Sequence, residues 1–154
     1  MRNSKGVAHR MDKKFMELAM SVARQSDCEV PVGAVLVRQG AVIASSGNRV
    51  FRDSDPTAHA EMFVIREAIQ RLGVKFLVDF ELYVTLEPCP MCMYAMSLSR
   101  VGTLCFAAYD EKRGAISNGC LGTGTYFHVP IIYEGLMEDE AKELLSSFFR
   151  ILRN

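Results

Sequence analysis

Two short segments of the sequence carry the residue types of a metal-dependent active site. One contains His59 and Glu61, and the other contains Cys89 and Cys92 within the run Glu-Pro-Cys-Pro-Met-Cys. Zinc is commonly bound by imidazole nitrogen and thiolate sulfur, and three protein ligands leave one of its four positions open for water. Because the metal lowers the pKa of that water toward neutrality, the pattern favours a catalytic zinc site with His59, Cys89 and Cys92 as ligands.

Glu61 fits the role of the acid and base in such a site. Residues two apart point to roughly opposite sides of a helix, so His59 and Glu61 can share a site only at the first turn. The Asp-Pro-Thr before them is typical of a helix start, and Pro90 favours a second helix start at the cysteines. We therefore expect two helix N-termini to converge on one zinc ion, with Glu61 carrying protons and not binding the metal.

The cysteines alone would leave other readings open. A Cys-x-x-Cys pair is also typical of a structural zinc knuckle or a redox pair. The joint pattern His-x-Glu with Pro-Cys-x-x-Cys is more specific and matches the signature of zinc deaminases. Cys28 and Cys120 lie in polar segments, and if either supplied a fourth zinc ligand, the site would be closed to water. Cys105 is expected to be a buried core residue.

Hydrophobic periodicity and turn residues predict four helices and five strands. The helices are expected over residues 11–25, 58–72, 90–100 and 137–152. The strands are expected over residues 34–37, 41–45, 82–86, 101–108 and 129–133, with a glycine-rich loop over 114–124. This order predicts an α/β fold, a three-layer α/β/α sandwich around one five-stranded mixed sheet. The first two strands form an antiparallel hairpin at Gln39-Gly40, and the later strands are parallel.

Length and composition are those of an ordinary globular domain. The 154 residues are 49% hydrophobic and 23% charged, and the net charge is zero, so composition gives no sign of a polyanionic partner. Residues 11–154 are expected to form a single domain, and residues 1–10 a disordered tail without a signal sequence. No apolar run is long enough to span a membrane, so we expect a cytoplasmic protein.

From about residue 11 to its end, the chain resembles the bacterial tRNA-specific adenosine deaminases of the cytidine-deaminase-like superfamily. The segments that carry the resemblance are residues 29–37, 47–50, 55–61, 82–92 and 134–150. The resemblance implies a cytidine-deaminase-like fold and hydrolysis of adenosine to inosine at the wobble position (34) of a tRNA anticodon. It also implies one zinc ion per subunit and a homodimer that binds the anticodon stem-loop.

The resemblance also implies which residues meet the substrate. These residues are Asn48, Ala60, Pro88 and Asp110. Lys112 and Arg113 could reach phosphates. Tyr109, Phe148 and Phe149 could stack on bases, although aromatic residues at such spacing usually pack inward. The residues after Gly114 depart from the family's usual pattern, so this loop is expected to contact RNA differently.

Two other functions compete with this reading. A deaminase of a free nucleobase such as guanine or cytosine would share the whole zinc site, and the neutral net charge favours it. A non-catalytic RNA-binding module stabilised by zinc is the other, but such a module has no use for Glu61 beside an open metal position.

Overall fold

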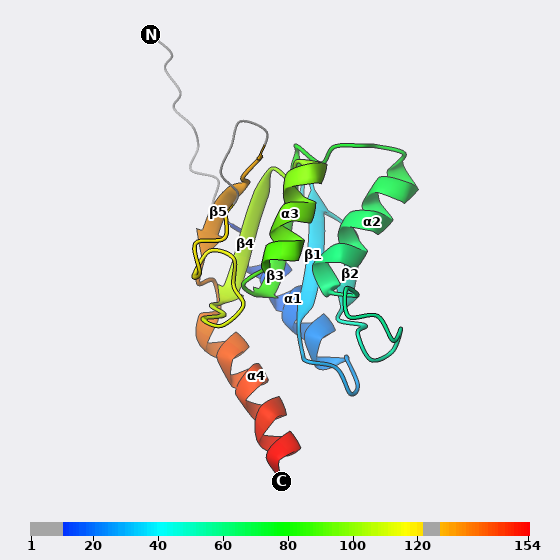
Figure 1. The fold of residues 1–154 in the computed structure, drawn as a ribbon. Helices are drawn as coiled ribbons and strands as arrows, with labels where there is room; N and C mark the ends of the chain where they lie inside the picture. The colour runs from blue at the N-terminus through cyan, green and yellow to red at the C-terminus, as the bar shows by residue number, and fades with distance from the viewer. Residues whose placement is uncertain (1–10, 122–126) are drawn as a thin grey trace.

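We describe the protein from a computed structural model that covers residues 11–121 and 127–154 (Figure 1). The predicted tail, residues 1–10, and residues 122–126 lie outside this description. The helices are α1 (Lys13–Arg24), α2 (Ala60–Leu72), α3 (Pro90–Ser99) and α4 (Glu138–Arg153). The strands are β1 (Gly33–Arg38), β2 (Ala41–Gly47), β3 (Phe80–Leu86), β4 (Thr103–Ala108) and β5 (Ile131–Glu134).

The strands form one mixed sheet in the order β2-β1-β3-β4-β5. Strand β1 is antiparallel to both β2 and β3, whereas β3, β4 and β5 are parallel to one another. The predicted hairpin is confirmed, and Gln39 and Gly40 between its strands both have positive φ, 50° and 77°. The parallel pairing of β4 and β5 is confirmed as well, and the described part of the chain between these two strands contains no helix.

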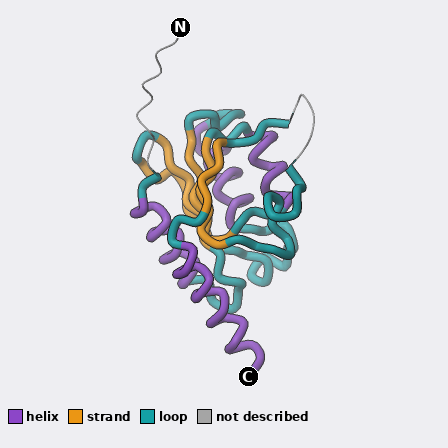
Figure 2. Tube along the Cα trace, turned by 90° about the vertical axis from the view of Figure 1, so that its left-hand side faces the viewer, coloured by secondary structure: helices purple, strands orange, loops and turns teal. Residues whose placement is uncertain are grey.

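Helices cover both faces of the sheet, which confirms the three-layer prediction (Figures 1 and 2). Leu36 and Val84 belong to the core beneath α2 and α3. Their neighbours Val35 and Tyr83 belong to the core beneath α1 and α4. This alternation follows from the two-residue period of a strand. Cys105 is fully buried in the second core, as predicted. Among the described residues, no helix is both long and apolar enough to cross a membrane.

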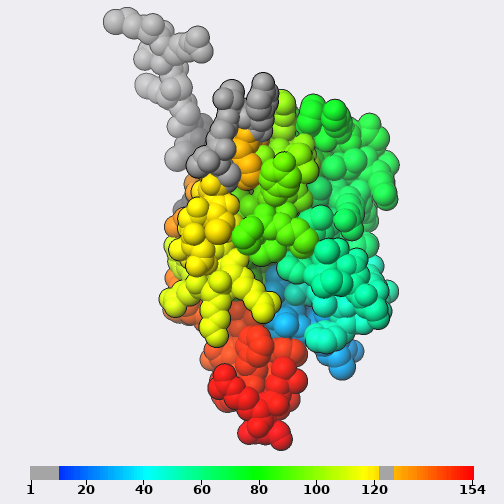
Figure 3. Space-filling view, in the orientation of Figure 1, coloured from blue at the N-terminus to red at the C-terminus, as the bar shows by residue number. Residues whose placement is uncertain are grey.

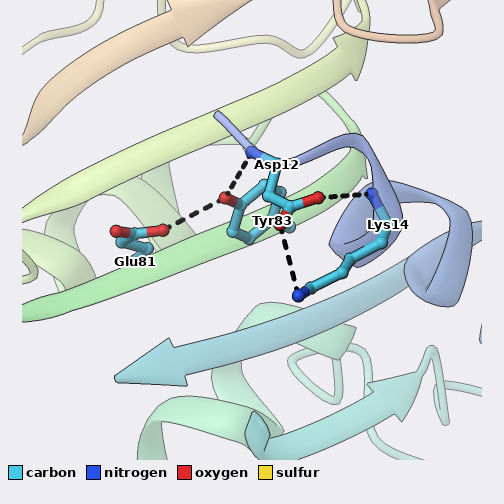
Figure 4. Close-up of polar contacts among 4 residues, drawn as sticks. All are labelled: Asp12, Lys14, Glu81 and Tyr83. Atoms are coloured by element: carbon cyan, nitrogen blue, oxygen red, sulfur yellow. Dashed lines mark hydrogen bonds and ion pairs between the residues drawn. The ribbon is translucent and has the colours of Figure 1, made fainter. Parts of the chain in front are cut away.

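Helix α1 is fixed to the centre of the sheet. The Asp12 carboxylate accepts a hydrogen bond from the Lys14 backbone N–H at 3.0 Å and so caps the helix. The Asp12 N–H donates to the Tyr83 hydroxyl at 3.2 Å, and that hydroxyl donates to Glu81 at 3.1 Å (Figure 4). Near the middle of α1, the helix packs closely against β1 at Gly33. Only glycine fits there, because a Cβ at residue 33 would lie 2.0 Å from the Ala19 carbonyl oxygen.

Candidate metal centre and active site

The structure brings together the three side chains that the sequence marks as zinc ligands. One donor atom from each of His59, Cys89 and Cys92 lies within 4.8 Å of the other two. The Nδ1 atom of His59 is 3.6 Å from both sulfur atoms. Tetrahedral zinc with ordinary bond lengths separates a nitrogen ligand from a sulfur ligand by about 3.6 Å, so the donor set fits this ion.

Two helix starts position these ligands. His59 is the N-cap of α2, and Cys89 is the N-cap of α3, both with extended backbone. Pro90 occupies the first turn of α3, where its missing N–H costs no hydrogen bond, and Cys92 follows in the same turn. The partial positive charge at both helix N-termini stabilises the thiolate form of nearby cysteines.

The electrostatics of the cluster favour a cation. A hydrogen bond from Cys92 lowers the pKa of Cys89 to about 4, and His59 contributes in the same direction. The pKa of Cys92 is raised, chiefly by this shared proton and by burial. The pKa of His59 is also raised, chiefly by its hydrogen bond to Cys89. One thiolate therefore forms readily, whereas the second requires a cation to displace its proton.

Glu61 lies in the first turn of α2, as the spacing to His59 predicts, and its side chain is 4% exposed. Burial raises its pKa to about 7, and both Cys92 and His59 interact with it. A carboxyl group with a pKa near neutrality can both accept and return a proton at physiological pH. Its position and pKa are those that a general acid and base would need.

The residues expected to meet the substrate already have structural contacts. The Asn48 side chain accepts from the Ala60 N–H at 3.0 Å and donates to the Val30 carbonyl at 3.3 Å. Because His59 does not cap α2 with its own side chain, Asn48 satisfies a free N–H of that helix. Ala60 and Pro88 are buried, and the Pro88 carbonyl accepts from Ala115 at 2.9 Å.

Asp110 shapes the loop that follows β4. Its carboxylate accepts from the N–H groups of Lys112 at 3.1 Å and Arg113 at 3.0 Å. These two basic residues line a cavity of about 330 Å³ together with Cys89. In Figure 3 the segment around residues 110–120 (yellow) and the segment around residues 50–59 (turquoise) lie on opposite sides of α3 (green).

The inward packing expected of three aromatic residues is not what the structure shows. Tyr109 is 39% exposed and Phe149 43% exposed, whereas Phe148 is half-buried. The reason is local, because Tyr109 follows the last residue of β4 and α4 buries only Ala141 fully.

The remaining cysteines do not extend the metal cluster. Cys28 and Cys120 are exposed, and the cluster among the described residues contains neither of them. Cys120 nevertheless lines the same cavity as Cys89.

Two buried carboxyl groups beside the site had no predicted role. Glu29 accepts from the N–H groups of Phe51 and Arg52, both at 2.8 Å. Glu87, directly before Pro88, makes similar bonds to the loop after β4. Each glutamate thus holds a loop that borders the site. The only sequence signal was the place of Glu87 next to the cysteine motif.

Comparisons with known proteins agree with this geometry. The family model for the cytidine and deoxycytidylate deaminase zinc-binding region matches residues 9–108. The chain is 49% identical to a tRNA-specific adenosine deaminase of Agrobacterium fabrum, over 88% of this chain and 92% of that protein. It is 45% identical to the tRNA-specific adenosine deaminase of Aquifex aeolicus, over 91% of this chain and 95% of that one.

A solved structure from a study of A-to-I editing by tRNA:A34 deaminases at the wobble position of transfer RNA has the same fold. It superposes with a TM-score of 0.81 at 46% identity, covering 87% of this chain and 100% of that chain. The chain therefore belongs to the zinc-dependent cytidine and deoxycytidylate deaminase family and, within it, to the tRNA-specific adenosine deaminases.

Proposed function

We propose that this protein hydrolyses adenosine to inosine at the wobble position of a tRNA anticodon, with zinc as its cofactor. The observation that carries the proposal is the cluster of His59, Cys89 and Cys92 beside the buried Glu61. The strong similarity to tRNA-specific adenosine deaminases over nearly the whole chain points to adenosine in tRNA as the substrate.

The donor atoms that would hold the metal are Nδ1 of His59 and the sulfur atoms of Cys89 and Cys92. When bound, zinc supplies a Lewis acid that makes a water molecule nucleophilic near neutral pH. Two thiolates and a neutral imidazole leave the centre with little net charge, which suits a neutral substrate base.

Glu61 carries the protons of the reaction. Its carboxylate accepts a proton from the attacking water as the oxygen bonds to C6 of adenine, and it returns that proton to the ring nitrogen N1. A second proton of the water passes to the amino group through the same carboxyl, the C6–N bond breaks, and ammonia leaves. Adenosine and water thereby give inosine and ammonia without an oxidant or a reductant.

The target base must leave its stack to reach Glu61, since the reacting atom is not accessible inside a folded loop. Asn48, Ala60 and Pro88 surround the start of α2 and the cysteine motif, where we place the base. Lys112 and Arg113, beside the cavity next to Cys89, are placed to meet phosphates. A local basic loop of this kind can bind RNA even though the net charge of the chain is zero.

A homodimer belongs to the same proposal. On α3, Tyr94 is 55% and Leu98 63% exposed, so one face of this helix presents an apolar strip to solvent. A second copy of the chain packed on this strip would cover it and bring another subunit close to the metal site. We also propose that the enzyme works in the cytoplasm, where its tRNA substrate is found.

Substrate competition tests the function. The protein is incubated with an anticodon stem-loop that carries adenosine at the wobble position, and separately with free guanine, cytosine and adenine. We expect inosine in the stem-loop and negligible product from the free bases. Deamination of a free base without conversion of the stem-loop would establish the competing nucleobase deaminase instead.

A further inference from the structure

The buried carboxyl group of Glu87 is bonded entirely to one loop. Its residue is 3% exposed, and the described residues include no ion-pair partner for it. One oxygen accepts from the Ser117 N–H at 2.7 Å. The other accepts from the Asp110 N–H at 2.9 Å and from the Ser117 hydroxyl at 2.6 Å. Because a buried carboxyl group is costly unless hydrogen-bonded, these contacts tie the loop firmly to the residue.

Gly114 is what allows the loop to wrap around this carboxyl group. A Cβ at Gly114 would lie 2.2 Å from Cδ of Glu87 and 2.3 Å and 2.4 Å from its two oxygens. No real Cβ makes contacts this short, so any larger residue at 114 would displace either the carboxyl group or the loop. Glu87 and Gly114 are therefore complementary in shape, although they lie far apart in the sequence.

Two backbone hydrogen bonds also join this region to the segment that carries Cys89. The Glu87 N–H donates to the Ala108 carbonyl at 2.8 Å, and the Ala115 N–H donates to the Pro88 carbonyl at 2.9 Å. Cys89 is the next residue after Pro88. The loop over 110–118 and the start of α3 are thus joined at one point, and a cavity of about 330 Å³ lies between them.

Hydrogen bonds within the loop hold its backbone together, so fixing its two ends also fixes the backbone positions of Lys112 and Arg113. The Asp110 carboxylate accepts from the N–H groups of Lys112 and Arg113. The Asn118 amide donates to the Gly114 carbonyl at 2.9 Å and to the Glu111 carbonyl at 3.2 Å. Loss of the Glu87 contacts would let this unit move as a body relative to Cys89.

We propose that Glu87 is a positioning residue for the RNA substrate: it holds the 110–118 loop against the metal site so that the basic side chains of Lys112 and Arg113 meet the anticodon backbone. The inference rests on the proposed function, because it assumes an RNA substrate. Among the described residues, the Glu87 carboxylate is hydrogen-bonded only to Asp110 and Ser117, so we expect its loss to change RNA binding and not the chemical step.

A test compares Glu87→Gln with the wild-type protein on the wobble stem-loop. The glutamine side chain would place its NH₂ group against N–H or O–H donors of Asp110 and Ser117 that now face a carboxylate oxygen. Since hydrogen bonds to a charged group contribute strongly, we expect KM to rise about tenfold while kcat stays within about threefold. Zinc content should stay near one per chain. The backbone N–H groups of Asp110 and Ser117 should exchange with deuterium faster than in the wild type.

Two further variants keep the proposal testable if Glu87→Gln folds poorly. Ser117→Ala removes only the hydroxyl bond, so KM should rise about fivefold or less. Gly114→Ala should reproduce the phenotype of Glu87→Gln, and its effect should largely disappear in a Glu87→Ala background, where the new methyl group has room. Glu17→Gln makes the same chemical change on the exposed surface of α1 and should alter neither KM nor exchange.

The proposal is overturned if KM and loop exchange stay at wild-type values in Glu87→Gln and Ser117→Ala. It is also overturned if kcat and zinc content fall together with the rise in KM in every variant, since Glu87 would then support the metal centre alone. The exchange measurement needs no RNA. A wild-type protein that left the stem-loop unchanged would therefore refute the proposed function, and loop exchange would still decide whether Glu87 holds the loop.

Discussion

The Nδ1 atom of His59 and the Sγ atom of Cys89 lie 3.6 Å apart, although 30 positions separate them in the sequence. This contact joins the N-terminus of α2 to that of α3, and the backbone around both is fixed by the packing of these helices on the sheet. The metal centre therefore depends both on the tertiary fold and on three individual side chains. Substitutions that weaken the fold and substitutions that remove a ligand can be told apart by experiment.

Glu61→Gln should abolish most activity while zinc stays bound. The amide is nearly the same size as the carboxyl group but cannot accept and return a proton, so we expect kcat to fall by about 10²–10⁴-fold. Single-turnover kinetics and metal analysis of the same sample provide the measurement. If the zinc-loaded variant retained wild-type turnover, Glu61 would not be the acid and base of the reaction.

Cys89→Ala should remove the zinc ion and with it the activity. Two remaining ligands do not hold zinc as three do, and chelator treatment of the wild-type protein should have the same effect until zinc is restored. Metal analysis after dialysis measures both. Cys28→Ala, which removes an exposed thiol, should keep full zinc content. Full occupancy in Cys89→Ala would show that Cys89 is not a ligand.

Zinc binding should release protons and weaken as the pH falls. The pKa of Cys89 is lowered to about 4, so this thiol is already ionised at pH 7, whereas the pKa of Cys92 is raised and its proton must leave when the metal binds. The raised pKa of His59 adds part of a second proton. Calorimetric titration of the chelator-treated protein in buffers of different ionisation enthalpy should give about one to two protons released. Binding without proton release would contradict this assignment.

Gly33→Ala should destabilise the whole fold. The new Cβ would lie 2.0 Å from the Ala19 carbonyl oxygen and 2.9 Å from the Ala23 nitrogen. Both are backbone atoms of α1, so this helix must move away from β1. Overpacking of this kind costs about 1–3 kcal/mol in the free energy of unfolding. Urea denaturation followed by circular dichroism measures it. An unchanged midpoint would mean that α1 is free to shift without loss of packing.

Local sequence patterns were sufficient for the elements and for the core of the site. Pro90 marks a helix start, Gln39-Gly40 marks a hairpin, and the spacing of His59 and Glu61 required a first turn; each of these features is present in the structure. Their signals lie within a few residues of one another, and their physical causes are the helix and strand periods and the turn conformations.

Contacts between distant segments could not be predicted in this way. Asn48 binds the Ala60 N–H across 12 positions, and Glu87 binds Ser117 across 30. Nothing in the composition around either residue shows that its polar group will be satisfied from another loop. The exposure of Phe149 was missed for a related reason, because the pattern of α4 does not show that the sheet leaves most of this helix uncovered.

Whether the enzyme deaminates the wobble adenosine with zinc can be measured at a single position of a single RNA. An anticodon stem-loop with adenosine at the wobble position, and a matched one with that adenosine moved to the neighbouring position, are incubated with zinc-loaded and with chelator-treated protein. Inosine is then measured by mass spectrometry of the digested nucleosides. We predict inosine only in the wobble stem-loop and only with zinc present. Equal conversion at both positions, or conversion that survives removal of zinc, would show that the protein is not a zinc-dependent deaminase of the wobble adenosine.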